Sequence, residues 1–364
     1  MSLIGTPFHA LSIVLAIALT LGTIAVWDRL RGPAPLRSGL RLALLLIAEA
    51  TAVLVVLVSL NDSYLLYDSW RDLAGGTGAT RLEPGAAGVG VQALTIRTGD
   101  PGHPDFHPAG GGLLGADPVG ARSGIRGNLY VWLPPEYDQP EHRGERFPVV
   151  ELLPGQPGSP MAWFDAMHGQ DALEALVRGG EARPMILVAA KSNTMGSSDA
   201  GCADLPGPAG LRTATWLGQD VPAIISSEFR VSADPYDWSL MGYSAGGYCA
   251  ANLAVHYPQV FHSAVSISGY NDPVAPVVRS RPGLVAPNDP LLVLRGADPQ
   301  PDIALLLTGS REDGTTVGDA RALIAALRAP ATGDLLTVAR GSHTMDVWVA
   351  MLPDSFRWIS RHLR

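Results

Sequence analysis

The sequence predicts an α/β domain with a mostly parallel central sheet flanked by helices, preceded by two transmembrane helices. Three observations lead to this prediction. Two long apolar runs, at residues 8–27 and 42–60, stand close together near the N-terminus. Short, wholly apolar segments such as 147–153 are typical of strands that are covered on both faces. A glycine-flanked serine, Ser244, separates a strand-like segment from a helical one.

The composition limits the class of protein. A chain of 364 residues allows about two units of roughly 150 residues, or one large domain with an appendage. Hydrophobic residues make up 47% and charged residues 16%, which excludes a wholly disordered chain. The mean hydropathy of +0.16 favours membrane segments. A net charge of −8 argues against a basic nucleic-acid-binding surface, so no nucleic-acid partner is expected.

The two apolar runs are interpreted as membrane spans. From Phe8 to Trp27 the chain has no Asp, Glu, Lys or Arg. The 19 residues from His9 to Trp27 measure about 28 Å as a helix, enough to cross the hydrocarbon. The run from Leu42 to Leu60 is similar, with one charge, Glu49. Buried core helices are the alternative, but neither run is amphipathic. A cleaved signal peptide is a second alternative for the first run, which lacks a basic start and a small-residue cleavage site.

The loop between the spans predicts the orientation. It places Arg29, Arg31, Arg37 and Arg41 against one acid, Asp28. The positive-inside rule puts this loop in the cytoplasm, so both termini and the following domain are expected to be extracytoplasmic, with membrane lipid around the two spans. Aromatic residues suited to the membrane interface follow the second span, namely Tyr64, Tyr67 and Trp70.

Glu49 lies inside the second span. It is about 12 Å along the helix from Arg41, and an acid at that depth costs about 2–3 kcal/mol on insertion scales. It is interpreted either as a proton or partner site, or as a protonated or helix-facing acid without a catalytic task.

The chain is expected to divide into three parts. Residues 1–72 form the membrane anchor, 73–88 a linker of small residues and glycines, and 89–364 the extracytoplasmic domain. A helix is predicted at 171–180, with glycines at its end. The stretch 99–124 is rich in Gly and Pro, and no regular structure is expected there. Strands are predicted at 89–98, 126–135, 147–153 and 185–190.

The segment 236–258 has the pattern of a nucleophile elbow. A strand-like segment leads into Gly242-Tyr243-Ser244-Ala245-Gly246, and a helical segment follows. This G-x-S-x-G turn is tight, so the neighbours of the serine at ±2 must be small. The helix N-terminus favours negative charge, and the amide of Ala245 is placed to bind an oxyanion. The elbow predicts the α/β-hydrolase fold with Ser244 as nucleophile.

A serine nucleophile needs a base and an acid, which follow it in this fold in the order Ser, acid, His. A strand at 303–309 is followed by Glu312 and Asp313, and either could be the acid, unless both are solvated turn residues. A strand at 335–339 runs into a turn with His343, the predicted base. His262 and His362 are the other histidines after the elbow helix.

A second oxyanion donor is expected from the loop after an early strand. The segment 149–163 contains Pro154-Gly155-Gln156, and the backbone amide of Gln156 is the candidate donor. The glycine would let the backbone approach the substrate. The alternative is an ordinary proline–glycine turn.

Residues from about 89 to 364 resemble the Putative esterase family of α/β-hydrolases, which includes mycobacterial mycolyltransferases, feruloyl esterases and S-formylglutathione hydrolases. The resemblance implies a serine esterase or acyltransferase, an acyl-ester substrate, a sugar or lipid hydroxyl as a possible acceptor, and no metal or organic cofactor. The two-span anchor resembles membrane-tethered actinobacterial members. The matching segments are SGIRGNLYVWLPPEY at 123–137, the LLPGQ loop, GYSAGG at the elbow, and GSHTMDVW at 341–348.

The oxyanion loop departs from both kinds of relative. Feruloyl-type members carry His-Gly where this chain has Pro154-Gly155, and mycolyltransferases carry an arginine where Gln156 and Pro157 stand. A mycolyl ester of trehalose is therefore not implied as the substrate, whereas acyl-ester chemistry is.

The chain has two cysteines, Cys202 and Cys249, too few for a cysteine-rich scaffold or a four-cysteine zinc site. In an extracytoplasmic domain they are expected to form a disulfide, which would stabilise the fold by about 4 kcal/mol in the chain-entropy model. Two free thiols are the alternative.

Two further interpretations remain open. A hydrolase fold could serve as a non-catalytic binding module of the cell envelope, and a peptidase is a weaker rival.

The histidines at 103–107 could suggest a metal, but without carboxylates at ligand spacing they are interpreted as loop residues, and no metal site is predicted.

Overall fold

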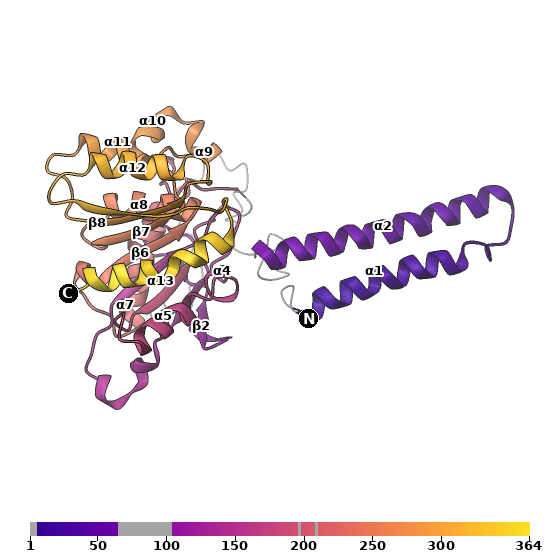
Figure 1. Cartoon of the computed structure of the whole chain (residues 1–364), viewed down its shortest axis with the longest axis horizontal. Coiled ribbons are helices and arrows are strands. Elements are labelled where there is room, and N and C mark those ends of the chain that lie inside the picture. The colour runs from indigo at the N-terminus through magenta and orange to yellow at the C-terminus, as the bar shows by residue number, and fades with distance from the viewer. Residues whose placement is uncertain (1–5, 65–103, 196–197, 208–209) are drawn as a thin grey trace, which may run out of the picture. The chain divides into compact units, whose positions relative to one another are not determined.

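The computed structural model describes residues 6–64, 104–195, 198–207 and 210–364. The chain divides into two compact units, Met1–Gly76 and Thr77–Arg364, which are drawn in Figure 1. The predicted strand at 89–98 and the predicted linker at 73–88 lie outside the described residues.

The N-terminal unit is a helical hairpin of α1 (Thr6–Val26) and α2 (Ala34–Tyr64). At the connection, the Arg41 guanidinium donates to the Trp27 carbonyl over 3.0 Å and lies 4.8 Å from the centre of the Trp27 ring. Toward the other end, the Ser59 hydroxyl and the His9 imidazole are 2.9 Å apart. Polar contacts therefore tie the two helices together near both ends.

Both helices are long and apolar enough to cross a membrane. Large apolar side chains such as Val14, Ile24 and Val56 are exposed on them, unlike those of a core helix. The second helix begins eight residues before the predicted span, because Pro35 fits the first helical turn, where its missing N–H costs no hydrogen bond. Glu49 is exposed on this helix.

The C-terminal unit is built on a sheet in which the structure describes nine strands, in the order β1-β2-β3-β5-β4-β6-β7-β8-β9. The pairs from β1 to β5 along this order are antiparallel, and all the later pairs are parallel. The strands are β1 (His107–Gly110), β2 (Leu113–Ala116), β3 (Leu129–Trp132), β4 (Val149–Leu153), β5 (Ile186–Ala190), β6 (Trp238–Tyr243), β7 (Ser263–Ile267), β8 (Ala304–Ser310) and β9 (Thr332–Val338).

The strand order places a switch point beside β4. From β4 the chain moves to β5 on one side and then returns to β6 on the other. Loops that leave the carboxyl ends of β4 and β6 therefore diverge, and ligands of open α/β sheets bind in the crevice between such loops.

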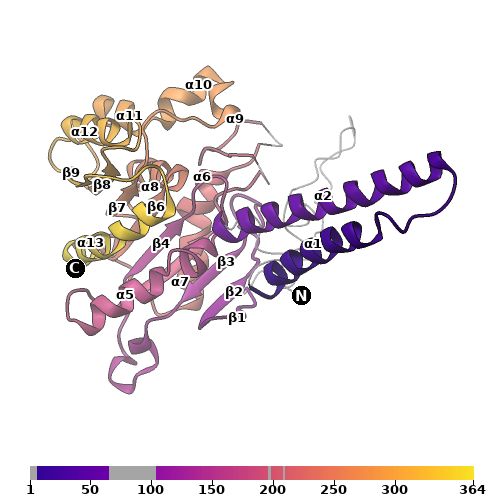
Figure 2. The same cartoon turned by 45° about the vertical axis from the view of Figure 1, so that its right-hand side comes forward.

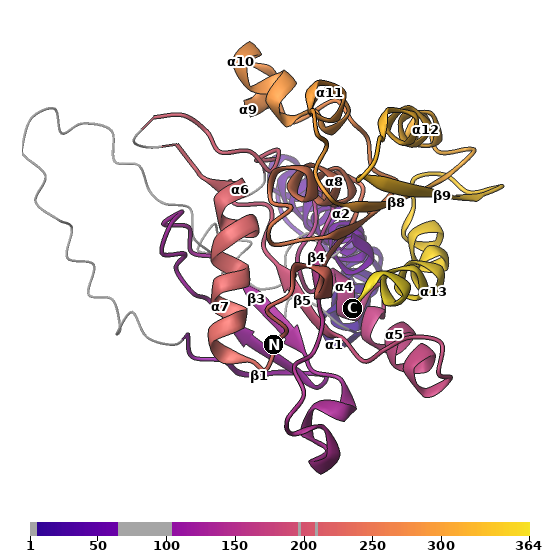
Figure 3. The same cartoon turned by 90° about the vertical axis from the view of Figure 1, so that its left-hand side faces the viewer.

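Helices cover both faces of the sheet. Figure 3 shows α7, α8 and α12 on one face and α5 and α13 on the other. The helices of this unit that lie in the described residues are α4 (Ala162–Asp165), α5 (Gly169–Arg178), α6 (Thr213–Thr215), α7 (Val221–Glu228), α8 (Ala245–His256), α9 (Pro276–Arg279), α10 (Pro282–Val285), α11 (Pro290–Gly296), α12 (Thr316–Ala326) and α13 (Met345–His362).

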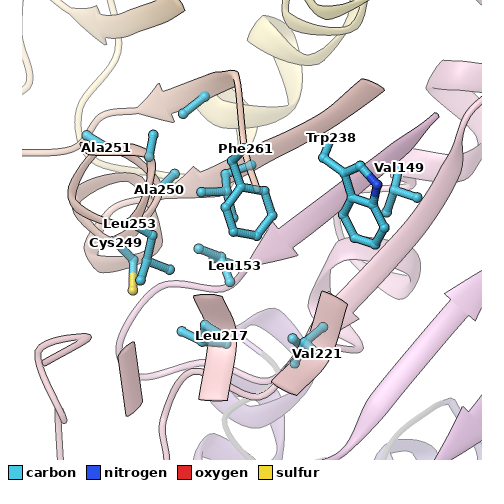
Figure 4. Packing of buried hydrophobic residues seen from close by; sticks show 14 of the residues in the cluster. Val149, Leu153, Leu217, Val221, Trp238, Cys249, Ala250, Ala251, Leu253 and Phe261 are labelled. Carbon is cyan, nitrogen blue, oxygen red and sulfur yellow. The ribbon is translucent and has the colours of Figure 1, made fainter. Parts of the chain in front are cut away.

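Each face of the sheet has its own apolar core. Val149 and Leu153 of β4 pack toward α7 and α8, where Figure 4 shows them among Trp238, Val221 and Leu253. Val150 and Leu152 of the same strand pack on the other side with apolar residues of α5 and α13. Covering on both faces explains why the parallel strands have continuous apolar sequences rather than alternating ones.

The expectation that 99–124 has no regular structure is wrong. From His107 onward this stretch forms β1 and β2, and β2 pairs with β3 (Figure 2). The glycines that suggested an irregular chain form the turn of this hairpin: Gly110, Gly111 and Gly112 all have positive φ, which side chains rarely tolerate.

Glu151 is an acid in the middle of β4. It lies on the same side of the strand as Val149 and Leu153, and it is fully buried. Among the described residues neither carboxyl oxygen has a hydrogen-bond partner. Burial raises the pKa of the Glu151 carboxyl well above its usual range, because the charged form would lose its hydration.

We expect Glu151 to make the fold less stable as the pH rises. Above about pH 4.3 the unfolded chain ionises this group while the folded domain keeps the proton. The free energy of unfolding then falls by up to about 1.4 kcal/mol per pH unit until the raised pKa is reached. Glu151→Gln should remove this slope and be more stable than the wild type at pH 8.

Urea unfolding between pH 5 and 8 would measure the effect in detergent-solubilised protein. Glu141→Gln, at an exposed position, is the matched control and should keep the wild-type slope. Equal slopes in the wild type and Glu151→Gln would contradict a buried, protonated Glu151.

Candidate active site

Ser244 stands at the turn between β6 and α8 in a strained conformation. Its φ is 56° and its ψ is −122°, a region that residues other than glycine rarely occupy. The turn closes so tightly that a Cβ on Gly242 would collide with the Gly246 carbonyl, and a Cβ on Gly246 with the Leu153 carbonyl. The G-x-S-x-G pattern is thus the sequence that this backbone requires.

His343 lies beside Ser244, on the loop between β9 and α13. Its Nε2 is 2.8 Å from the Ser244 Oγ, and its Nδ1 is 3.0 Å from each carboxyl oxygen of Asp313. The Asp313 side chain is 6% exposed and that of His343 is 41% exposed. A carboxylate at Nδ1 favours the tautomer with the proton there, which leaves Nε2 free to accept the serine proton.

The other predicted acid, Glu312, makes a different contact. Its Oε2 accepts a hydrogen bond from the Gly341 N–H over 2.9 Å. Gly341 has a φ of 109° and begins the turn that holds His343. The structure therefore brings Asp313 to the imidazole, and Glu312 to the backbone of the loop that carries it.

The loop after β4 touches the nucleophile. A Cβ on Gly155 would lie 2.8 Å from the ring of Tyr243 and 3.3 Å from the Ser244 Cβ. Gln156 follows directly in this loop. Ala245 is the first residue of α8, where backbone N–H groups have no partner within the helix. Both predicted oxyanion donors thus belong to backbone that adjoins Ser244.

Three aromatic rings support this arrangement. His343 packs edge-to-face against Trp348 with 4.9 Å between centroids, and Trp348 stacks on Tyr243 at 4.7 Å. Trp163 lies 5.3 Å beyond Tyr243. Burial raises the pKa of Tyr243, and the Gly155 backbone N–H donates to its hydroxyl. The sequence offered only a weak signal for these contacts, since Tyr243 occupies a variable position of the elbow motif.

Cys202 and Cys249 form the predicted disulfide, with 5.6 Å between their Cα atoms. It links the segment around residue 202 to α8, five residues after the nucleophile. The same two residues help to line a small cavity of about 10 Å³, together with Ala245 and Asn193. The disulfide therefore lies beside the same small cavity as Ala245, the residue that follows the nucleophile.

The other histidines weighed in the sequence analysis do not join this arrangement. His262 precedes β7 and stacks on Tyr236 at 3.7 Å, and His362 packs on Trp358. His107 lies in β1, and His103 is outside the described residues. In the part of the chain that the structure describes, no group of three or more His, Cys, Asp or Glu side chains could hold a metal ion.

Sequence comparison places this chain among known proteins. Residues 121–359 match the family described as Putative esterase. A relative from Corynebacterium glutamicum, described as an uncharacterized protein, is 24% identical over 248 residues, which cover 64% of this chain and 57% of the relative. The chain thus spans less than two thirds of the length of that relative.

Solved structures with the same fold include a ferulic acid esterase, with a TM-score of 0.58 and 20% identity over 69% of this chain and 98% of that one. An S-formylglutathione hydrolase from Agrobacterium tumefaciens has a TM-score of 0.58 and 16% identity, covering 71% and 99%. A fluorophosphonate-binding serine hydrolase of Staphylococcus aureus has a TM-score of 0.54 and 16% identity, covering 71% and 99%. At these identities the likeness shows the α/β-hydrolase fold.

Proposed function

Because this chain belongs to the Putative esterase family, we propose that it is a membrane-anchored serine esterase or acyltransferase that acts on acyl esters. One observation carries the proposal. The Ser244 hydroxyl, the His343 imidazole and the Asp313 carboxylate form a continuous hydrogen-bonded chain on a strained elbow. This is the arrangement that activates a serine for acyl transfer.

In the proposed reaction the Ser244 Oγ attacks the ester carbonyl while His343 Nε2 takes its proton. Asp313 orients the imidazole and stabilises its charged form. The backbone amides of Ala245 and Gln156 hold the oxyanion of the tetrahedral intermediate. The intermediate collapses when His343 gives the proton to the leaving alcohol, and an acyl-enzyme remains. Water, or a sugar or lipid hydroxyl, then attacks the acyl-enzyme with His343 again as base, which releases the acid or the new ester.

The proposed location is the outer side of a cell membrane. Helices α1 and α2 are the proposed spans, and the four arginines between them favour a cytoplasmic connecting loop. The catalytic domain and both termini would then be extracytoplasmic. The Cys202–Cys249 disulfide supports this location, because disulfides persist in oxidising compartments. An enzyme held there would meet envelope lipids and acylated glycans.

A non-catalytic binding module on the same fold is the rival proposal. It would be favoured by a broken triad or a covered serine. The hydrogen bond between Ser244 and His343, and the partly exposed imidazole, argue against it.

A fluorophosphonate probe tests the proposal on the full chain in detergent. We expect a single adduct on the wild type by intact mass, and none on Ser244→Ala. Ser342→Ala is the matched control: this serine is exposed and adjoins His343, so its loss should leave labelling intact. A folded wild type without an adduct, or an adduct that persists in Ser244→Ala, would overturn the proposal.

A further inference from the structure

Asn193 holds the loop after β4 from outside the triad. It follows β5, the strand next to β4, and only 9% of it is exposed. Its side-chain Nδ2 donates to the Gly158 carbonyl over 2.7 Å and to the Gly155 carbonyl over 3.2 Å. Two carbonyl acceptors require the NH₂ end of the amide at this place. The Asn193 NH₂ group therefore binds the carbonyls of Gly155 and Gly158, which flank Gln156 and Pro157.

The Gly155 carbonyl and the Gln156 N–H belong to one peptide unit. A trans peptide is planar, so its C=O and N–H point in opposite directions. A hydrogen bond that fixes the direction of the Gly155 carbonyl therefore also fixes that of the Gln156 N–H. The N–H of Gly155 is held as well, by the Tyr243 hydroxyl. Both peptide units around Gly155 are thus anchored beside Ser244.

We propose that Asn193 is a positioning residue for the oxyanion hole, and this inference rests on the proposed function. By holding the Gly155 carbonyl it keeps the Gln156 N–H aimed at the site where the oxyanion forms. The same bond polarises the peptide unit, which strengthens the Gln156 N–H as a donor. In this proposal Asn193 acts through the backbone of the loop, not on the substrate or the reacting atoms.

The test compares Asn193→Ala and Asn193→Asp with the wild type, using the full chain in detergent and p-nitrophenyl butyrate as substrate. Removing one oxyanion donor outright costs about a hundredfold to a thousandfold in kcat. A donor that is present but poorly aimed should cost less, so we expect Asn193→Ala to lower kcat by about tenfold to a hundredfold with KM within about threefold. Asn193→Asp keeps the size but not the donors, and it should lose at least as much activity.

A transition-state analogue separates positioning from general destabilisation. A short alkyl trifluoromethyl ketone forms an oxyanion on the serine, so its Ki should rise in proportion to the loss of kcat/KM. Asn271→Ala is the matched control, because this buried asparagine donates to the Asp319 carbonyl, away from the loop. It should lower Tm while leaving kcat and the Ki of the ketone near wild-type values.

Each outcome separates the inference from the proposed function. Wild-type kcat and Ki in folded Asn193→Ala and Asn193→Asp, alongside an inactive Ser244→Ala, would overturn the role of Asn193 and leave the esterase proposal standing. An equal loss of kcat in Asn271→Ala would likewise overturn the role of Asn193, because it would show that loss of any buried asparagine has the same effect on activity. Turnover that persists in Ser244→Ala would overturn the proposed function itself. If Asn193→Ala does not fold, the isosteric Asn193→Asp still decides between these outcomes.

Discussion

Replacing Asp313 by asparagine is expected to lower kcat by about ten-thousandfold, whereas replacing Glu312 by glutamine should leave kcat within about threefold of the wild-type value. Both Asp313 oxygens lie 3.0 Å from the His343 Nδ1. An asparagine can donate to Nδ1, which would hold the proton on Nε2, where the imidazole can no longer accept the serine proton. Glutamine at 312 keeps an oxygen that accepts from the Gly341 N–H.

Steady-state hydrolysis of p-nitrophenyl butyrate by the two single variants measures this difference. Thermal unfolding serves as the check that both variants are folded. The reverse result, with Glu312→Gln inactive and Asp313→Asn active, would assign the triad acid to Glu312 and contradict the geometry.

Replacing Gly246 by alanine is expected to destroy the fold of the elbow, with a loss of more than about 4 kcal/mol in the free energy of unfolding. A Cβ at this position would collide with the Leu153 carbonyl and lie 2.6 Å from that of Pro154. Neither obstacle is a side chain that can rotate away. Relief would require β4 and the first turn of α8 to separate, which would also move the oxyanion loop.

Gly318 provides a control with the opposite sign. It lies exposed in α12, and an added Cβ there would meet nothing within 4 Å. Replacing glycine by alanine in a helix interior stabilises the helix by about 1 kcal/mol. The Gly318→Ala protein should therefore have a slightly higher free energy of unfolding than the wild type. Urea unfolding of the two variants gives the comparison. A Gly246→Ala protein within about 1 kcal/mol of the wild type would show that the elbow is not as tight as described.

Local features of this protein could be predicted from the sequence because their causes are local. The elbow needs small residues two positions either side of Ser244, and a strand and a helix that flank it, all within 236–258. Apolar runs of sufficient length indicate helices that can cross a membrane, since only length and composition decide that property. The parallel strands were recognisable because both of their faces are buried. The strand and turn that precede His343 predicted it as the catalytic base.

Three features depended on the tertiary structure, for physical reasons. Glu312 and Asp313 are neighbours in one turn, and only the path of that turn decides which carboxyl points at the imidazole. The glycines at 110–112 can serve a loop or a hairpin, and pairing of β2 with β3 selects the hairpin. Asn193 lies 38 residues from Gly155, and they meet because β4 and β5 are adjacent parallel strands. The sequence by itself determined the serine turn and the apolar helices, whereas the contacts around that serine were decided by strands that are distant in the chain.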